Sequence, residues 1–129
     1  MKRSLFALLL CVPLLAGAQS IASKIEQMGE MRYVRVAALK SAVRDGLLKV
    51  QMELYNEDHG QQVVHWRVRW LDEDGFQVGG DEPWKQELLH GRQTRVFQTV
   101  APSRRAADFK IELQSPENNA YSGSADAYQ

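Results

Sequence analysis

Three histidines are the first residues to test for chemistry, because imidazole serves both in metal binding and in proton transfer. They are His59, His65 and His90, and no two of them have the spacing expected of ligands in one metal site. His59 falls in a polar loop, and His65 shares a strand face with Arg67, whose positive charge opposes a bound cation. The sequence therefore predicts no metal site and no cofactor.

Other reactive residue types also lack the surroundings that catalysis needs. The single cysteine, Cys11, lies in an apolar N-terminal run, and no serine stands in a Gly-x-Ser-x-Gly turn. Met28 and Met31 carry the thioethers that copper prefers, although the same pair suits the apolar contacts of a short helix. We therefore expect a non-enzymatic protein, and a periplasmic small-ligand-binding or metal-handling domain is the alternative.

Six residues on the predicted surface are candidates for binding, and they are His65, Arg67, Arg69, Trp84, Arg104 and Arg105. The first three alternate along one strand face, where their charge would suit the acidic groups of a partner or the phosphates of the cell wall and of lipids. Trp84 follows a proline and is expected either to anchor a partner or to close one end of the core. We predict an envelope protein as the partner, and a merely solvated strand face is the alternative interpretation.

The N-terminus has the pattern of an export signal. Two basic residues precede the apolar run Leu5–Leu15, whose 11 residues are about half of the ~20 that span a bilayer as a helix. Small residues follow at positions 16–18, which predicts cleavage between Ala18 and Gln19. A lipid anchor needs a cysteine where Ala18 stands. We therefore expect a periplasmic protein without a lipid anchor, soluble after cleavage, and an uncleaved anchor is the alternative.

The charge balance excludes some classes of partner. Removal of residues 1–18 leaves 14 basic and 16 acidic residues, a formal charge of −2, and the two signs are interspersed. A nucleic-acid-binding domain normally shows a basic face or a high isoelectric point, so we expect no nucleic acid. The remaining 111 residues contain no cysteine and suffice for one domain with one core.

Alternation of apolar and polar residues with period two dominates the rest of the chain, as in strands with one buried face. The clearest segments are Leu47–Asn56, Val63–Asp72 and Asp108–Gln114. Weaker ones are Tyr33–Leu39, Phe76–Val78, Trp84–His90 and Thr94–Val100. About seven short strands without helical crossovers predict an all-β fold, an antiparallel, immunoglobulin-like β-sandwich with Trp66 and Trp70 in its core.

The predicted organisation is a signal peptide (1–18), a linker (19–32), the β-sandwich (33–114) and a flexible C-terminal tail (115–129). The Asn56–Gln62 link is open to two interpretations. If it closes a hairpin, Leu54 faces Trp66 and Glu53 faces Arg67. If it crosses between sheets, those pairs do not form.

Three segments together resemble a known family. They are "DGLLKVQMELYNED", "VVHWRVRWLDEDGFQV" and "PWKQELLHGRQTRVFQTVAPSRRAADFKIELQ". In their order and spacing they resemble the YcfL-like family of bacterial envelope proteins, over about Val34 to Gln114. The resemblance implies a periplasmic β-sandwich, usually a lipoprotein, without an established enzymatic activity. The chain departs from that pattern at Ala18, where the relatives would carry the lipidated cysteine.

Overall fold

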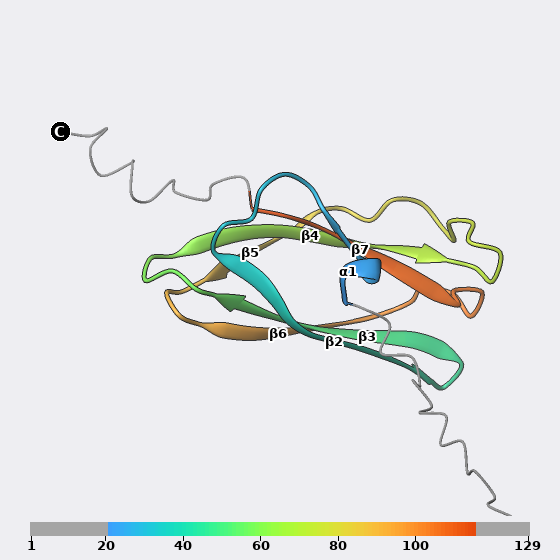
Figure 1. The fold of residues 1–129 in the computed structure, drawn as a ribbon. Coiled ribbons are helices and arrows are strands. Elements are labelled where there is room, and N and C mark those ends of the chain that lie inside the picture. The colour runs from blue at the N-terminus through green and yellow to red at the C-terminus, as the bar shows by residue number, and fades with distance from the viewer. Residues whose placement is uncertain (1–20, 116–129) are drawn as a thin grey trace, which may run out of the picture.

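Residues 21–115 form two β-sheets that pack face to face in this computed structural model (Figure 1). The structure describes these residues. In chain order, their elements are α1 (Ile21–Lys24), β1 (Ile25–Gln27), β2 (Val34–Arg44), β3 (Leu47–Asn56), β4 (Gln62–Leu71), β5 (Lys85–Leu89), β6 (Thr94–Val100) and β7 (Asp108–Gln114). The all-β sandwich that the alternation predicts is confirmed.

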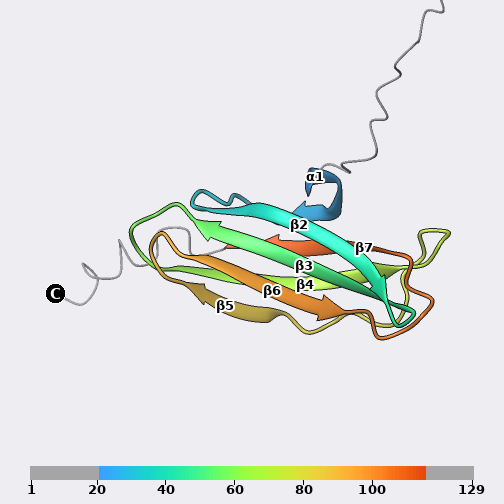
Figure 2. The same ribbon diagram turned by 90° about the horizontal axis from the view of Figure 1, so that it is seen from below.

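The strands divide into a four-stranded sheet A, in the order β1-β7-β4-β5, and a three-stranded sheet B, in the order β2-β3-β6. Neighbouring strands are antiparallel, except that β1 runs parallel to β7. Figure 2 shows sheet B in front of sheet A. Each sheet therefore has one face towards the core and one towards solvent.

Most of the strands lie where the alternation places them. β3, β6 and β7 have the predicted bounds, while β4 and β5 differ from prediction by one residue at each end. Phe76–Val78, in contrast, is not a strand, because only the isolated bridge between Leu71 and Gln77 forms there. Asp72 Oδ1 accepts hydrogen bonds from the backbone of Asp74 and Phe76, and this turn brings the segment back onto β4. Because β4 ends at Leu71, the returning segment meets only its last residues, where Val78 N–H donates to the Trp70 carbonyl.

The core is built from aromatic and aliphatic side chains of both sheets. Trp66 and Trp70 expose only 3% and 2% of their surface, as predicted. The Trp66 ring lies 5.6 Å from Phe97 of sheet B, whereas the Trp70 ring lies 6.5 Å from Phe109 within sheet A. The contact between Trp66 and Phe97 therefore joins the two layers through large apolar surfaces.

β2 is longer than predicted because Asp45 and Gly46 close a tight hairpin with β3. Both residues have positive φ angles, 52° and 78°, as the two central residues of a type I′ turn require. The pairing extends from Arg44 opposite Leu47 to the N-terminal end of β2. A register shift after Val36 reverses which residues face the core, and this interrupts the alternation that marks a strand in sequence.

The link from Asn56 to Gln62 crosses between the sheets, because β3 belongs to sheet B and β4 to sheet A. The hairpin interpretation, with Glu53 opposite Arg67, is therefore wrong. The buried Asn56 side chain holds the crossing in place by donating hydrogen bonds to three backbone carbonyl groups, those of Gly60, Leu89 and His90.

The segment predicted as a linker (19–32) contributes to the sandwich in its described part. Ile25–Gln27 forms β1 and pairs with Ile111–Leu113 of β7. Three residues are too few for the alternation to be visible, and their partner strand lies more than 80 residues further on. The predicted cleavage between Ala18 and Gln19, the signal peptide and residues 116–129 of the predicted tail lie outside the described residues.

Candidate binding surfaces

The outer face of sheet A carries the predicted stripe, and its two arginines are neutralised within the protein. Arg67 and Arg69 of β4 both donate hydrogen bonds to Glu112 of β7, with 2.6 Å between Arg67 Nε and Glu112 Oε2. The Glu112 side chain exposes only 4% of its surface. Arg69 also lies 3.6 Å from Glu26 of β1. The stripe therefore does not present the free positive charge that the sequence analysis expected of it.

Trp84 stacks against this network. The Arg67 guanidinium lies 4.4 Å from the centre of the Trp84 ring, within the range of a cation–π contact. Arg67 Nη1 also donates to the backbone oxygen of Glu82, at 3.4 Å. Trp84 is half-buried and does not belong to the core cluster. Its position matches neither a core plug nor a freely projecting anchor.

The other three predicted residues lie outside this network. His65 is half-buried on the outer face of sheet A, between Gln86 and Gln114 of the neighbouring strands. Arg104 and Arg105 are exposed in the loop between β6 and β7, and the Arg104 guanidinium lies against Gly46 in the hairpin of sheet B. The six candidates therefore do not form one continuous surface, and their role in binding stays a prediction.

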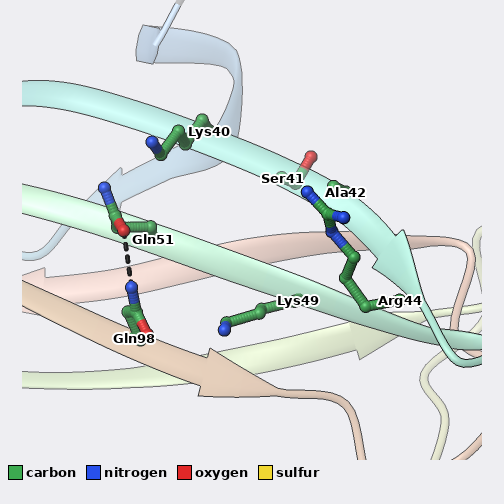
Figure 3. A pocket seen from close by; sticks show the side chains of 7 residues that line it. All are labelled: Lys40, Ser41, Ala42, Arg44, Lys49, Gln51 and Gln98. Atoms are coloured by element: carbon green, nitrogen blue, oxygen red, sulfur yellow. Dashed lines mark hydrogen bonds between the residues drawn. The ribbon is translucent and has the colours of Figure 1, made fainter.

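The outer face of sheet B holds a shallow depression that the sequence analysis did not identify. It has a volume of about 350 Å³. We call it the cationic trough, and it is lined by Lys40, Ser41, Ala42, Arg44, Lys49, Gln51 and Gln98 (Figure 3). These residues come from all three strands of the sheet. The trough is therefore a property of the assembled sheet.

The cations of the trough have no acidic partners among residues 21–115. Lys40, Arg44 and Lys49 take part in none of the ion pairs found within that range. The polar groups beside them are the Gln51 and Gln98 amides, which hydrogen-bond to each other at 2.6 Å. The outer faces of the two sheets thus differ, with arginines neutralised on sheet A and free cations on sheet B.

Part of this trough was accessible to sequence reasoning. The alternation over Leu47–Asn56 already places Lys49 and Gln51 on the outward face. The Asp45-Gly46 pair is typical of a two-residue hairpin turn, and this hairpin brings Lys40 and Arg44 alongside β3. Recognition of that turn would have placed the three cations on one face.

A second depression, of about 620 Å³, opens between the sheets at one end of the sandwich. Its lining includes Ser41 and Leu48 of sheet B, the turn at Asp72, and Asp108. Burial raises the pKa of Asp108. The hydrogen bond from Lys24 at 2.6 Å and the backbone bond from Phe109 outweigh it, so the net pKa is lowered. We call this depression the end cleft.

The histidines and methionines of residues 21–115 do not gather into a metal site. Within residues 21–115, no group of three or more His, Cys, Asp or Glu side chains is arranged to hold a metal ion. His59 lies beside Arg92, His90 beside Gln61, and Met31 packs against the core. No helix in this part of the chain has the length and apolar content needed to cross a bilayer.

The fold and the outer faces of sheets A and B define a small β-sandwich with a cationic face on one sheet. A family model described as protein of unknown function (DUF1425) matches residues 21–115, and the chain belongs to this family. No protein with a curated description matches it.

Two solved structures share the fold. Cj0090 of Campylobacter jejuni is 20% identical, with a TM-score of 0.63 over 71% of this chain and 97% of that one. A DUF1425 member from Shewanella sp. pv-4 is 22% identical, with a TM-score of 0.58 over 67% of this chain and 82% of that one. At these identities the likeness concerns the fold alone.

Proposed function

We propose that this protein is an exported, non-enzymatic binding module of the bacterial cell envelope, and that its cationic trough binds an acidic protein partner. The observation that carries the proposal is the set of three cations, Lys40, Arg44 and Lys49, without acidic partners in the described part of the chain. Their mutual repulsion is relieved when carboxylates of a partner approach. Such binding needs charge and shape, and no nucleophile or general base takes part.

Apolar side chains beside the trough favour a protein over a simple anion. Val96 and Val100 of β6 expose 52% and 50% of their surface on the same outer face as Lys49. Protein interfaces commonly combine an apolar centre with a polar and charged rim. An acidic protein surface can contact both the valines and the cations.

The envelope location is supported by the sequence of the N-terminus. Its apolar run, small residues and lack of a cysteine at Ala18 fit an exported protein released by signal peptidase. The resemblance to YcfL-like envelope proteins agrees with that location. Mass spectrometry of the exported protein tests it, because cleavage before Gln19 is expected and an intact residue 1 or a lipid adduct contradicts it.

Binding to poly-L-glutamate, measured by fluorescence anisotropy at low salt, tests the trough. The variant Lys40→Glu with Lys49→Glu should weaken binding by roughly tenfold or more. The matched control is Lys85→Glu with Lys110→Glu, which changes the net charge equally but alters sheet A. Equal losses in both variants would contradict a specific role for the trough.

The same variants distinguish a protein partner from a lipid surface. Vesicles of phosphatidylglycerol with phosphatidylethanolamine replace the polypeptide in a sedimentation assay. The proposal expects weak vesicle binding that the trough variant and the control variant reduce alike. Strong vesicle binding that only the trough variant abolishes would overturn the assignment of an acidic protein.

A further inference from the structure

β2 forms an open edge of sheet B beside the cationic trough. Within residues 21–115, β2 pairs with β3 on one side and has no strand on the other, as the order β2-β3-β6 shows (Figure 2). Unpaired strand edges present a row of backbone donors and acceptors that another strand can use. The C-terminal half of β2 also carries Lys40 and Arg44, the two cations that this strand contributes to the trough.

The hydrogen-bond pattern identifies which residues of β2 point their backbone groups to the open side. The Ala101 N–H group donates to the Leu48 carbonyl, and the Asn56 N–H group donates to the Gln93 carbonyl. The even-numbered residues of β3 therefore form their backbone hydrogen bonds on the β6 side, away from β2. Odd-numbered residues of β3 must bond towards β2, because directions alternate along an antiparallel pair. Their partners include Lys40 and Ala42. The backbone groups of Ser41 and Val43 therefore face the open edge.

At this edge the core-facing side of β2 is left partly exposed by residues 21–115. Val43 lies opposite Leu48, a core residue, yet Val43 exposes 67% of its surface. Ser41, two residues earlier, lines the end cleft together with Leu48. An added strand next to β2 would extend sheet B over this opening, and its apolar side chains would contact Val43 and enter the cleft.

The following inference rests on the proposed function. We propose that the partner binds through an extended segment, which pairs with β2 at Lys40–Arg44 and so adds a fourth strand to sheet B. Lys40, Ala42 and Arg44 lie on the outward face, and Ser41 and Val43 on the inward one. The partner segment therefore alternates acidic residues, which meet the cations, with apolar residues, which cover Val43. Backbone bonds supply affinity and the alternating side chains supply specificity, as in other cases of strand addition.

A second copy of the chain fits this edge poorly. Antiparallel pairing of two β2 edges would bring Lys40 and Arg44 of one copy near the same residues of the other. Like charges at neighbouring cross-strand positions are destabilising. Lysine on an exposed edge is also a common protection against self-association. The charge of this edge thus favours an acidic strand over another β2.

Two synthetic peptides of about ten residues, the length of a long strand, test the inference. One alternates glutamate with valine and threonine, and the other has the same composition with its glutamates in one block. Strand addition predicts that the alternating peptide binds roughly tenfold more tightly. It also predicts that this peptide slows amide hydrogen exchange at Ser41 and Val43, measured by NMR on the wild-type protein. Binding to the outer face alone leaves those two amides unchanged.

Ser41→Pro removes an N–H group that faces the open edge, and edge positions of this kind tolerate proline. The matched control is Val96→Pro on β6, where the backbone likewise points away from β3. We expect Ser41→Pro to abolish the preference for the alternating peptide while binding of the block peptide persists, and Val96→Pro to keep the preference. Far-UV circular dichroism verifies that both variants fold.

The outcomes separate this inference from the function on which it rests. If both peptides bind equally, exchange at Ser41 and Val43 is unchanged and Lys40→Glu with Lys49→Glu still weakens binding, strand addition is wrong and the acidic-partner proposal stands. If neither peptide binds, both are wrong. A concentration-dependent dimer that Ser41→Pro dissolves would show that β2 pairs with a second copy, which overturns the inference.

Discussion

Replacement of Glu112 by glutamine tests whether the charge network stabilises sheet A. Removal of one partner from a buried ion pair costs about 3–5 kcal/mol, because the opposite charge is left without compensation. The Arg67 and Arg69 side chains remain 23% and 37% exposed, so water screens part of that loss. We therefore expect Glu112→Gln to lower the free energy of unfolding by about 2 kcal/mol. The melting temperature should fall by about 10 °C.

Glu26→Gln is the matched control, because Glu26 is the direct neighbour of Glu112 across β1 and β7. Its side chain is 36% exposed and lies 3.6 Å from Arg69 and 3.7 Å from Lys110. Exposed pairs of this kind contribute little, so the control should lose about 0.5 kcal/mol or less. Urea unfolding followed by tryptophan fluorescence and circular dichroism measures both variants, with an unchanged dependence on urea as the sign of an unchanged fold.

A double variant separates the loss of attraction from the burial of an uncompensated charge. Replacement of a whole buried ion pair by apolar side chains is often neutral. Arg67→Met with Glu112→Met should therefore be more stable than Glu112→Met alone. Equal losses in Glu112→Gln and Glu26→Gln, or a double variant less stable than the single one, would refute the argument that an uncompensated arginine causes the loss.

Three further variants test the core, the end cleft and a tight turn. Trp70→Ala should lower the free energy of unfolding by about 3–5 kcal/mol in urea titrations, because the ring is fully buried. In Asp108→Asn, the free energy of unfolding should decrease less than in the wild type as the pH is lowered from about 5 to about 2. The hydrogen bond from Lys24 lowers the pKa of Asp108 in the folded protein. The ionised Asp108 therefore contributes its full stabilisation at pH values above its pKa in the unfolded chain, and this stabilisation is lost as the pH falls below its pKa in the folded protein. Gly91→Ala should cost about 3 kcal/mol by calorimetry, since a Cβ would lie 1.9 Å from the carbonyl oxygen of His59.

The strands that the sequence marks most clearly, β3, β4 and β7, are those in which alternation is uninterrupted and one face is wholly buried. β3, with Leu48 to Leu54 inward, is an example. The pattern fails where the chain departs from that condition. In β2 a bulge reverses the alternation after Val36, and in β1 only three residues pair. Phe76–Val78 alternates in sequence, but it meets only the last residues of β4, where Val78 N–H donates to the Trp70 carbonyl, so the pairing is limited within residues 21–115 to one bridge.

The surfaces were less predictable than the strands, because they depend on which strands become neighbours. The outward position of Arg67 follows from the alternation, but its partner Glu112 is 45 residues away along the chain. Nothing in the local pattern distinguishes Arg67, which is neutralised, from Lys49, which is not. Only the order of strands within each sheet separates these two cations.

The formal charge of zero for the whole chain conceals an asymmetry that bears on how a partner approaches. On sheet A, β1 adds Glu26 beside Glu112, and the surrounding arginines and Lys110 compensate both carboxylates. On sheet B the Glu53 carboxylate lies on the same outward face of β3 as Lys49, but Lys40 and Lys49 take part in no ion pair within residues 21–115. An acidic partner is therefore oriented by the field of one face before contact, and association with that face should slow as salt is added, because exposed charges are screened.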